Sequence, residues 1–316
     1  MKILIYANGG ECIGLGHIMR MLVLCDSLKM FDVCFVSDNK IEYQTGHHIV
    51  EKCGFNLIKI NNLSDIFVLK ADFLIVDSYD VPASFFTEIK TKFKKVMCID
   101  DECELEFYDV DYIFNQNPYA RQLDYKISKR TKLIFDYCSL RDEFFNTQKI
   151  KINENIKNIF LTLGGSDDNN LTKKIIVNLQ KFLEDNGITL NVAIANAFKF
   201  KDEVRSLQNT FIKCHDNADM SKLMSMCDIG ICGLGQTTYE FLCLGVPIIG
   251  ITLAKNQENL AKFGVEMGML VNAKDDEILR ILQNLNYQKR LAIRENINSK
   301  FNMHRTSELD FNKIFY

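Results

Sequence analysis

The chain has 316 residues, 47% of them hydrophobic, and a formal net charge of −3 at pH 7. This length accommodates two α/β domains, and this hydrophobic content excludes a largely disordered chain. The slightly acidic balance and the lack of a basic stripe argue against nucleic acid as a partner.

The amino-terminal segment and the cysteines both indicate a cytoplasmic protein. Residues 2–7 form a short apolar run, but glycines follow it in place of the longer apolar region and cleavage site of a signal peptide. No apolar run is long enough to span a bilayer, so we expect no membrane insertion. The eleven cysteines form no C-x-x-C pair and lie mostly in apolar runs, as at Cys34 and Cys243. We therefore expect reduced, buried thiols rather than disulfides or zinc ligands.

The first part of the chain alternates short apolar runs with helical patterns. Apolar side chains repeat at helical spacing along residues 18–28, and Gly54 is placed to end a later helix. The apolar runs have the length of buried parallel strands and lie at residues 2–7, 32–37, 55–60, 72–77 and 95–99. This alternation predicts a doubly wound α/β sheet.

A second series of the same kind begins near residue 157, after a polar linker at residues 140–156. Gly187 and Gly245 are placed to end helices, and residues from about 276 to 316 have a helical pattern. The expected strands are 158–163, 190–195, 228–233 and 246–253, and the expected helices are 171–183 and 237–244. The sequence thus predicts two doubly wound domains, 1–145 and 146–300, with a cleft between them, and a final helix at 301–316 that crosses the domain boundary.

The loop after the first strand, NGGECIGLGH, is the first candidate site. Ligands of such sheets bind at the carboxyl ends of strands, and Gly14 and Gly16 allow the backbone to approach a ligand closely. His17 lies at the N-terminus of the following helix, where a positive charge is disfavoured and an imidazole tends to stay neutral. A neutral imidazole can take a proton from water, so His17 is a candidate general base.

Two other interpretations of this loop remain. Gly14-Leu15-Gly16 resembles the start of a dinucleotide fingerprint and Asp38 ends the second strand at a suitable distance, but Met19 occupies the third glycine position and the loop is too long. His17 could also be a capping or surface residue. The other histidines lack such a setting, and we expect them on the surface: His47, His48, His215 and His304.

The second half offers a glycine loop at Gly164, Gly165 and Ser166, after the strand at 158–163. Free amides at this junction with the next helix would suit a phosphate or a diphosphate. No Gly-Lys-Ser/Thr follows, so the loop is not a P-loop. A tight turn with Asp or Asn capping the next helix is equally compatible with the sequence.

Two further loops combine glycine or amide side chains with a helix start. Gly235, Thr237 and Thr238 open the helix predicted from residue 237, and Glu240 follows one turn later as a ribose ligand or a solvated helix carboxylate. The turn Lys255-Asn256-Gln257-Glu258 follows strand 246–253. There Asn256 and Gln257 could bind sugar substituents, or Asn256 could cap helix 257–266.

In combination these segments resemble the UDP-sugar hydrolases of pseudaminic acid biosynthesis. The shared pattern is a G-x-G-H loop, a strand followed by Gly-Gly-Ser-Asp, a glycine-started helix with a glutamate and a K-N-Q-E turn, in the same order along the chain. Those enzymes hydrolyse UDP-2,4-diacetamido-2,4,6-trideoxy-β-L-altropyranose. They are similar to SpsG-like spore-coat polysaccharide proteins and, more distantly, to MurG-type glycosyltransferases. The resemblance runs from residue 1 to about 270.

The resemblance implies a GT-B fold with two Rossmann-like domains, no cofactor, and a water activated by His17 that attacks the anomeric carbon with inversion. The free sugar would serve nonulosonic acid biosynthesis and flagellin glycosylation. The residues implied for the diphosphate are Gly164, Gly165, Ser166, Gly235, Thr237 and Thr238, with Glu240 for the ribose and Gly14, Gly16, Tyr79, Asn256 and Gln257 for the sugar.

Other functions of the same scaffold remain open: a GT-B glycosyltransferase, a hydrolysing epimerase and a non-catalytic UDP-sugar binding protein. The first half contains no basic amphipathic helix for a lipid acceptor, which favours hydrolysis. The acidic groups at 100–102 and at Asp109 and Asp111 are weak metal signals. We interpret the first as a cleft rim or a turn and the second as loop polarity. We therefore expect a metal-independent monomer.

Overall fold

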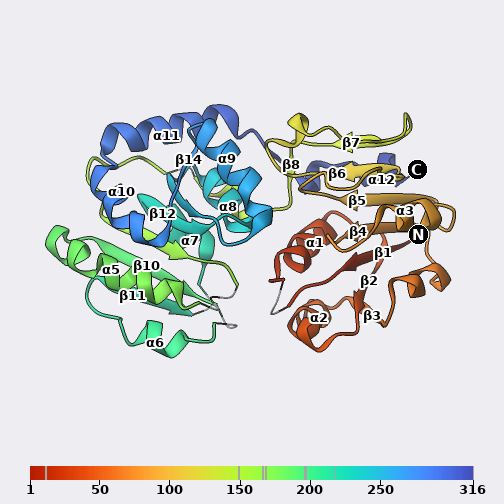
Figure 1. Ribbon diagram of the computed structural model, residues 1–316, viewed down its shortest axis with the longest axis horizontal. Helices are drawn as coiled ribbons and strands as arrows, with labels where there is room; N and C mark the ends of the chain where they lie inside the picture. Colours follow the sequence, from red (N-terminus) through yellow and green to blue (C-terminus); the bar gives the residue numbers. More distant parts are fainter. Residues whose placement is uncertain are drawn as a thin grey trace. The chain divides into compact units, whose positions relative to one another are not determined.

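The computed structural model describes residues 1–10, 13–148, 150–165, 167, 169–195, 198–216 and 218–315 (Figure 1). The chain forms two compact units: unit 1 is Met1–Leu140 with Met303–Tyr316, and unit 2 is Arg141–Asn302. The break falls a few residues before the expected 145/146 position because α4 (Asp142–Asn146) packs within unit 2. There the Cys243 thiol donates to the carbonyl oxygen of Phe144 at 3.5 Å, and the Phe144 side chain is buried.

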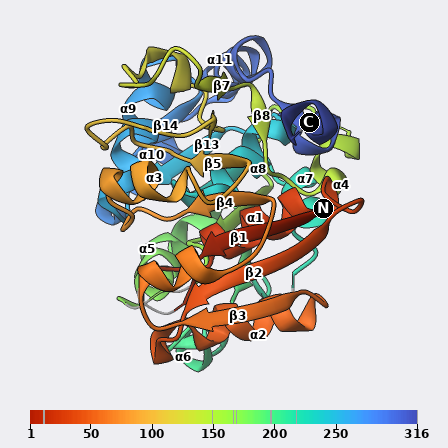
Figure 2. The same cartoon turned by 90° about the vertical axis from the view of Figure 1, so that its right-hand side faces the viewer.

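Unit 1 contains a parallel sheet in the order β3-β2-β1-β4-β5-β6-β7 (Figures 1 and 2). Its central strands are buried on both faces, which explains their near-continuous apolar sequences. The strands are β1 (Lys2–Ala7), β2 (Asp32–Asp38), β3 (Asn56–Ile60), β4 (Phe73–Asp77), β5 (Lys95–Ile99), β6 (Tyr112–Phe114) and β7 (Lys132–Ile134). The five strands expected here are therefore present, and β6 and β7 extend the sheet.

Helices cover both faces of this sheet, and the sheet separates the core of unit 1 into two clusters. One cluster of buried side chains joins β1 and β4 to α1 (Gly16–Asp26), α2 (Gln44–Lys52) and α12 (Phe311–Phe315). The other joins alternate residues of the same strands to α3 (Ala83–Ile89). Leu4 and Ile5 of β1 thus point into opposite clusters, as the two-residue period of a strand requires.

Helix α1 has an unusual buried face. Ile18, Met21, Leu24 and Cys25 pack into the core at helical spacing, as predicted. The polar side chains of His17 and Arg20 are buried on the same helix. Buried polar groups need hydrogen-bond partners, so these two residues must be bound by other elements of unit 1.

Unit 2 contains a second parallel sheet, in the order β11-β10-β9-β12-β13-β14. The expected glycine ends are confirmed, since Gly187 and Gly245 have φ of +62° and +70° and end two helices. The strands are β9 (Asn158–Thr162), β10 (Thr189–Ile194), β11 (Ile212–Asp216), β12 (Ile229–Gly233), β13 (Ile248–Ile251) and β14 (Leu270–Asn272). The helices are α4, α5 (Leu171–Asn186), α6 (Lys201–Arg205), α7 (Met220–Ser225), α8 (Gln236–Leu244), α9 (Glu258–Glu266), α10 (Ile278–Asn284) and α11 (Tyr287–Lys300).

After α11 the chain returns to unit 1. Residues 304–305 form β15 (His304–Arg305), which pairs with β8 (Tyr137–Cys138), and α12 then packs on the sheet of unit 1. The rings of Phe315 and Phe73 are stacked with centroids 4.3 Å apart. The expected continuous helical pattern to residue 316 is therefore wrong between α11 and α12, because this stretch pairs with β8 and then turns.

Candidate active site

Polar residues at or after the carboxyl ends of four neighbouring strands of unit 1 contact one another. His17 and Arg20 come from the helix that follows β1, and Asp77 is the last residue of β4. Asp101 and Asn117 follow β5 and β6. The chain leaves β1 toward β2 on one side and later forms β4 on the other, so β1 and β4 flank the switch point of the sheet. Ligands of doubly wound sheets bind at that point.

His17 and Asp77 form a buried pair. The Nδ1 atom of His17 lies 2.7 Å from Oδ1 of Asp77, and the two residues are 8% and 0% exposed. An ionised carboxylate only accepts hydrogen bonds, so Nδ1 carries a proton and donates a hydrogen bond to Asp77. In the neutral form of this ring Nε2 holds the lone pair, which is the arrangement that a general base requires.

Arg20 binds the same carboxylate side-on. Its Nε donates to Oδ2 of Asp77 at 2.7 Å, and its Nη2 donates to Oδ1. Nη1 donates to Oδ2 of Asp101 at 2.6 Å, so one guanidinium bridges two carboxylates. Burial alone would raise the pKa of Asp77, but Arg20 and His17 outweigh it and hold that pKa at about 2. Asp77 is therefore a carboxylate at neutral pH.

Tyr79 and Asn117 complete the set of contacts. The Tyr79 hydroxyl donates to Oδ2 of Asp101 at 2.7 Å, and Nδ2 of Asn117 donates to Oδ1 at 2.9 Å. The Tyr79 ring lies edge-on to the His17 ring, with centroids 4.7 Å apart. Tyr79 is 45% exposed, whereas its neighbours in this set are buried. It is thus the member of the set most accessible to a ligand.

The glycines of the first loop have different roles. A Cβ at Gly10 would overlap the carbonyl of Glu42, so Gly10 is required for close packing. Gly14 has a φ of +73°, which favours glycine, and its carbonyl accepts from the Gly10 amide at 2.8 Å. A Cβ at Gly14 or Gly16 would meet no other atom within 4 Å. The predicted residues Gly14 and Gly16 therefore border open space next to His17.

In unit 2, the N-terminus of α5 already holds a carboxylate. Asp167, 7% exposed, accepts from the amides of Leu171 and Thr172 at 2.7 and 2.8 Å. The alternative of an aspartate cap is therefore the one that the structure has, and these two helix amides cannot serve a diphosphate. Gly164, with a φ of +97°, and Gly165 are exposed in the preceding loop, whereas the predicted Ser166 lies outside the described residues.

The N-terminus of α8 is different, because its N-cap is Gly235, which has no side chain to satisfy the first-turn amides. Thr237 is partly exposed, but Thr238 is 0% exposed and its amide donates to the carbonyl of Gly235. Thr238 therefore has no atom at the surface for a ligand, and the proposed site does not include the diphosphate role predicted for it. A Cβ at Gly235 would lie 3.8 Å from Nε2 of Gln257, so the K-N-Q-E turn borders the same helix start.

The K-N-Q-E turn forms a 3₁₀ turn (Lys255–Gln257) before α9. Oε1 of Gln257 accepts from the Leu253 amide at 2.8 Å, which fixes the side chain across the turn. Gln257, not Asn256, is the N-cap residue of α9, and Asn256 is exposed. The alternative in which Asn256 is the N-cap residue of this helix is therefore not the one that the structure has.

Glu240 lies one turn into α8, with its side chain 13% exposed. Burial raises the pKa of Glu240 to about 7, against the opposing effect of Arg141, whose Nη2 lies 3.7 Å from Oε1. A carboxylate with this pKa changes charge near neutral pH. Such perturbed groups concentrate at functional sites, and this one borders the same helix start as Gly235.

The other acidic groups are held by protein partners. Asp109 pairs with Lys90, and Asp111 pairs with Lys95 and accepts from the Val96 amide, as expected for structural polarity. Asp101 lies in a bend after β5, as expected, and it also binds Arg20. Within the ranges that the structure describes, no group of three His, Cys, Asp or Glu side chains could hold a metal ion.

Two histidines that were expected on the surface are buried or half-buried, and the cysteines that the structure describes are free thiols. His47 is 4% exposed and its Nε2 lies 3.1 Å from Oγ of Ser37, so it is not a surface residue. His215 is half-buried against Asn191. The ten cysteines among the described residues are free thiols, and six of them are buried, as the apolar runs predicted.

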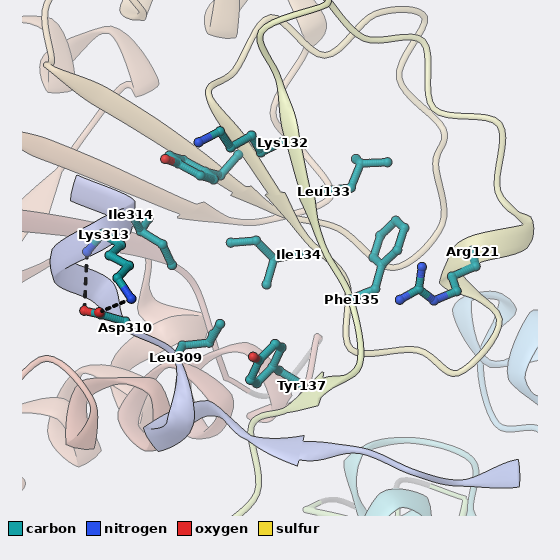
Figure 3. Close-up of a pocket in the computed structure, with 11 residues that line it drawn as sticks. Arg121, Lys132, Leu133, Ile134, Phe135, Tyr137, Leu309, Asp310, Lys313 and Ile314 are labelled. Atoms are coloured by element: carbon teal, nitrogen blue, oxygen red, sulfur yellow. Dashed lines mark hydrogen bonds and ion pairs between the residues drawn. The ribbon is translucent and has the colours of Figure 1, made fainter. Parts of the chain in front are cut away.

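A pocket of about 520 Å³ in unit 1 lies apart from these residues (Figure 3). Its lining comes from β6, β7 and the α12 segment, with Ile134, Tyr137 and Leu309 facing the hollow and Lys132 and Lys313 at its rim. None of the predicted site residues is among its lining residues. No helix in the described part of the chain has the length and apolar character that spanning a bilayer would require.

Sequence reasoning identified His17, Tyr79 and the glycines but missed Asp77, Arg20 and Asn117. Two features of the sequence could have indicated Asp77 and Arg20. Asp77 is the first polar residue after the buried run FLIV, at a strand end. Arg20 follows His17 by three residues on an otherwise apolar helix face, where an unpaired charge would be costly.

Comparison with known proteins concerns the fold and the relatives of the chain. No family model matches the chain. Similar solved structures include MurG of Acinetobacter baumannii, with a TM-score of 0.63 at 13% identity over 99% of this chain and 98% of that one. Another is the spinosyn rhamnosyltransferase SpnG, with a TM-score of 0.66 at 10% identity over 99% and 100%. These likenesses establish the GT-B fold, with two parallel Rossmann-like sheets, that the sequence predicted.

Three relatives are similar in sequence. An uncharacterized protein of Methanocaldococcus jannaschii, MJ1062, is 29% identical over 79% of this chain, which spans only 55% of that protein's length. The UDP-2,4-diacetamido-2,4,6-trideoxy-β-L-altropyranose hydrolase of Campylobacter jejuni is 27% identical over 87% of this chain and 100% of its own. The spore coat polysaccharide biosynthesis protein SpsG of Bacillus subtilis is 23% identical over 85% and 82%. The chain is therefore a distant homologue of this hydrolase and of SpsG.

Proposed function

We propose that the protein hydrolyses a UDP-linked 2,4-diacetamido-2,4,6-trideoxyhexose, with inversion, to UDP and the free sugar. The observation that carries the proposal is the buried His17–Asp77 pair at the switch point of a GT-B amino-terminal sheet. The substrate class is supported by the distant relationship to the Campylobacter jejuni hydrolase. The enzyme would act as a cytoplasmic monomer in nonulosonic acid biosynthesis, without a metal or a cofactor.

In unit 1, His17 acts as the general base. A water molecule transfers a proton to Nε2 while its oxygen forms a bond to the anomeric carbon, and the electron pair of the C–O bond leaves with UDP. Asp77 stabilises the imidazolium that results, because its carboxylate already accepts the Nδ1 proton at 2.7 Å. Tyr79, exposed beside the imidazole, and the open loop at Gly14 and Gly16 contact the sugar.

In unit 2, the N-terminus of α8 binds the leaving diphosphate. The amides after Gly235, including that of Thr237, lie at a helix start that lacks a side-chain cap and can bind an anion, and Gly164 and Gly165 are exposed in a second loop. These donors stabilise the charge that UDP gains when the bond breaks. Glu240 accepts hydrogen bonds from the ribose, and Asn256 and Gln257 from the adjacent turn bind sugar substituents.

A UDP-release assay with a panel of UDP-sugars, followed by NMR of the product sugar, tests the proposal. We expect release from UDP-2,4-diacetamido-2,4,6-trideoxyhexoses without any acceptor, and one ¹⁸O atom at the anomeric carbon when the reaction is run in H₂¹⁸O. UDP release only after addition of an acceptor would indicate a glycosyltransferase instead. A product with altered configuration at C2 would indicate a hydrolysing epimerase, and UDP binding without turnover would indicate a binding protein.

A further inference from the structure

Unit 1 buries two carboxylates around a single guanidinium. Asp77 is 0% exposed, Asp101 is 8% exposed, and Arg20 between them is 6% exposed. Arg20 forms ion pairs with both. A buried carboxylate is costly unless a cation and hydrogen-bond donors compensate its charge. Burial opposes the charge of Arg20 as well, but Asp101 and Asp77 raise its pKa well above its usual value.

His17 is the other group beside Asp77 that can carry a positive charge. Its Nδ1 lies 2.7 Å from Oδ1 of Asp77 and 3.1 Å from Nη2 of Arg20. Because Nδ1–H and Nη2–H are both donors, they do not bond each other and both donate to the same carboxylate oxygen. A protonated imidazole at this position would lie next to the guanidinium, and like charges at this distance repel.

We propose that Arg20 is a positioning residue that keeps His17 neutral and oriented as a base, because its guanidinium binds both oxygens of Asp77 and opposes a second positive charge on the adjacent imidazole. The inference rests on the proposed function only in naming His17 as the base. Without Arg20, the imidazole is the nearest group able to compensate Asp77 by taking a proton. An imidazolium has no lone pair with which to accept a proton from water.

The same guanidinium also connects the base to Tyr79. Asp101 accepts from Nη1 of Arg20 at 2.6 Å and from the Tyr79 hydroxyl at 2.7 Å, both on Oδ2. Oδ1 accepts from Nδ2 of Asn117 at 2.9 Å. Arg20 therefore holds Asp77 and, through Asp101, the hydroxyl of the tyrosine whose ring contacts His17. Lysine cannot reproduce this arrangement, because it lacks the planar fork that reaches three carboxylate oxygens at once.

The test is ¹⁵N NMR of the histidine rings, which distinguishes the Nδ1–H tautomer, the Nε2–H tautomer and the imidazolium. In the wild-type protein at pH 7 we expect His17, assigned with H17Q, as the neutral Nδ1–H tautomer. In R20Q we expect the imidazolium signature at the same pH. Arg290 provides a matched control, since it is 1% exposed but donates to backbone carbonyls of Leu285 and Glu154. R290Q should therefore leave the His17 signal unchanged, whereas an unchanged neutral signal in R20Q would overturn the proposal.

Steady-state kinetics supply a second readout. R20Q should lower kcat for UDP release by about 10²-fold or more, with KM within about threefold, since base catalysis is lost and UDP binding is not. If R20Q does not fold, R20K carries the test: its charge should keep the ring neutral, while the lost fork should lower kcat by about 10-fold to 10²-fold. Wild-type kcat in R20K would refute the positioning role. Failure of the wild-type protein to release UDP would refute the proposed function, while the NMR result would still decide the inference.

Discussion

Replacement of Asp77 by asparagine tests the central contact of the site. The carboxylate accepts three hydrogen bonds, from Nδ1 of His17 and from Nε and Nη2 of Arg20, and is fully buried. The asparagine amide offers one acceptor oxygen and two N–H donors in the same volume. If its nitrogen faces Arg20 Nε, two N–H donors oppose each other and that hydrogen bond is lost. If its nitrogen takes the place of Oδ1, it faces the Nη2–H donor of Arg20 as well as His17, and the imidazole must turn to the Nε2–H tautomer, which leaves no lone pair for water.

Each orientation opposes one guanidinium donor, and in both the neutral amide lacks the negative charge that would stabilise the imidazolium. The second orientation also removes the lone pair that the base requires. We therefore expect D77N to lower kcat by about 10²-fold to 10⁴-fold, the usual contribution of a general base. That range corresponds to about 3–5 kcal/mol of activation free energy. A lost hydrogen bond in the buried site should also lower the free energy of unfolding by about 1–3 kcal/mol. UDP affinity, which resides in unit 2 under the proposal, should change little.

Coupled UDP-release kinetics, isothermal titration with UDP and urea unfolding measure these three quantities. The matched control is D136N, because Asp136 is an exposed unit 1 residue with a φ of +67°, a conformation that asparagine also adopts. D136N should have wild-type kcat. A D77N variant with kcat within about threefold of wild type would show that the His17–Asp77 pair is structural only, and the reasoning about the base would be wrong.

Four further predictions concern both units. H17N should lower kcat by about 10²-fold to 10⁴-fold and leave the Kd for UDP within about twofold; a near wild-type kcat would remove His17 from the mechanism. Because burial raises the pKa of Glu240 to about 7, and ribose hydroxyls donate to its ionised form, UDP affinity should rise as pH increases from 6 to 8. E240Q should lose the part of this rise that UDP's own ionisation does not cause, and parallel pH profiles would contradict the ribose role. D167A should lower the free energy of unfolding by about 0.5–2 kcal/mol through the lost cap of α5, with UDP affinity maintained or increased; a large loss of affinity would assign that loop a direct role. Turnover should be unchanged in EDTA, and strict dependence on added Mg²⁺ would refute a metal-independent reaction.

Much of the architecture could be predicted because the central strands are buried on both faces and therefore read as uninterrupted apolar runs. Edge strands other than β3 gave no such signal. In β11, Lys213 and Asp216 are exposed at the margin of the unit 2 sheet, so the sequence IKCHD lacks an apolar run. The short β7 likewise exposes Lys132 and Leu133. The chain returns to unit 1 through β15, which pairs with β8. These two strands are far apart in sequence, so no local sequence pattern predicts their pairing.

The candidate site could be predicted only in part for a related reason. His17 and the glycines lie in one continuous loop, so their spacing is visible in the sequence. Asp77 and Asp101 meet Arg20 because β4 and β5 follow β1 in the sheet, and that order is a property of the fold. Conversely, local pattern alone could not decide whether α5 binds an anion, since the answer depends on where the Asp167 side chain turns.

The return of residues 303–315 to unit 1 has a consequence for biosynthesis. Unit 2 is continuous in sequence, whereas unit 1 is assembled from two segments on either side of it. Phe311 and Phe315 fill the core beneath β1 and β4, yet a ribosome adds them only after the whole of unit 2. Domains generally fold as units during synthesis. Part of the apolar sheet of unit 1 therefore stays uncovered until unit 2 has been translated. During this interval we expect unit 1 to be the unit more prone to aggregation.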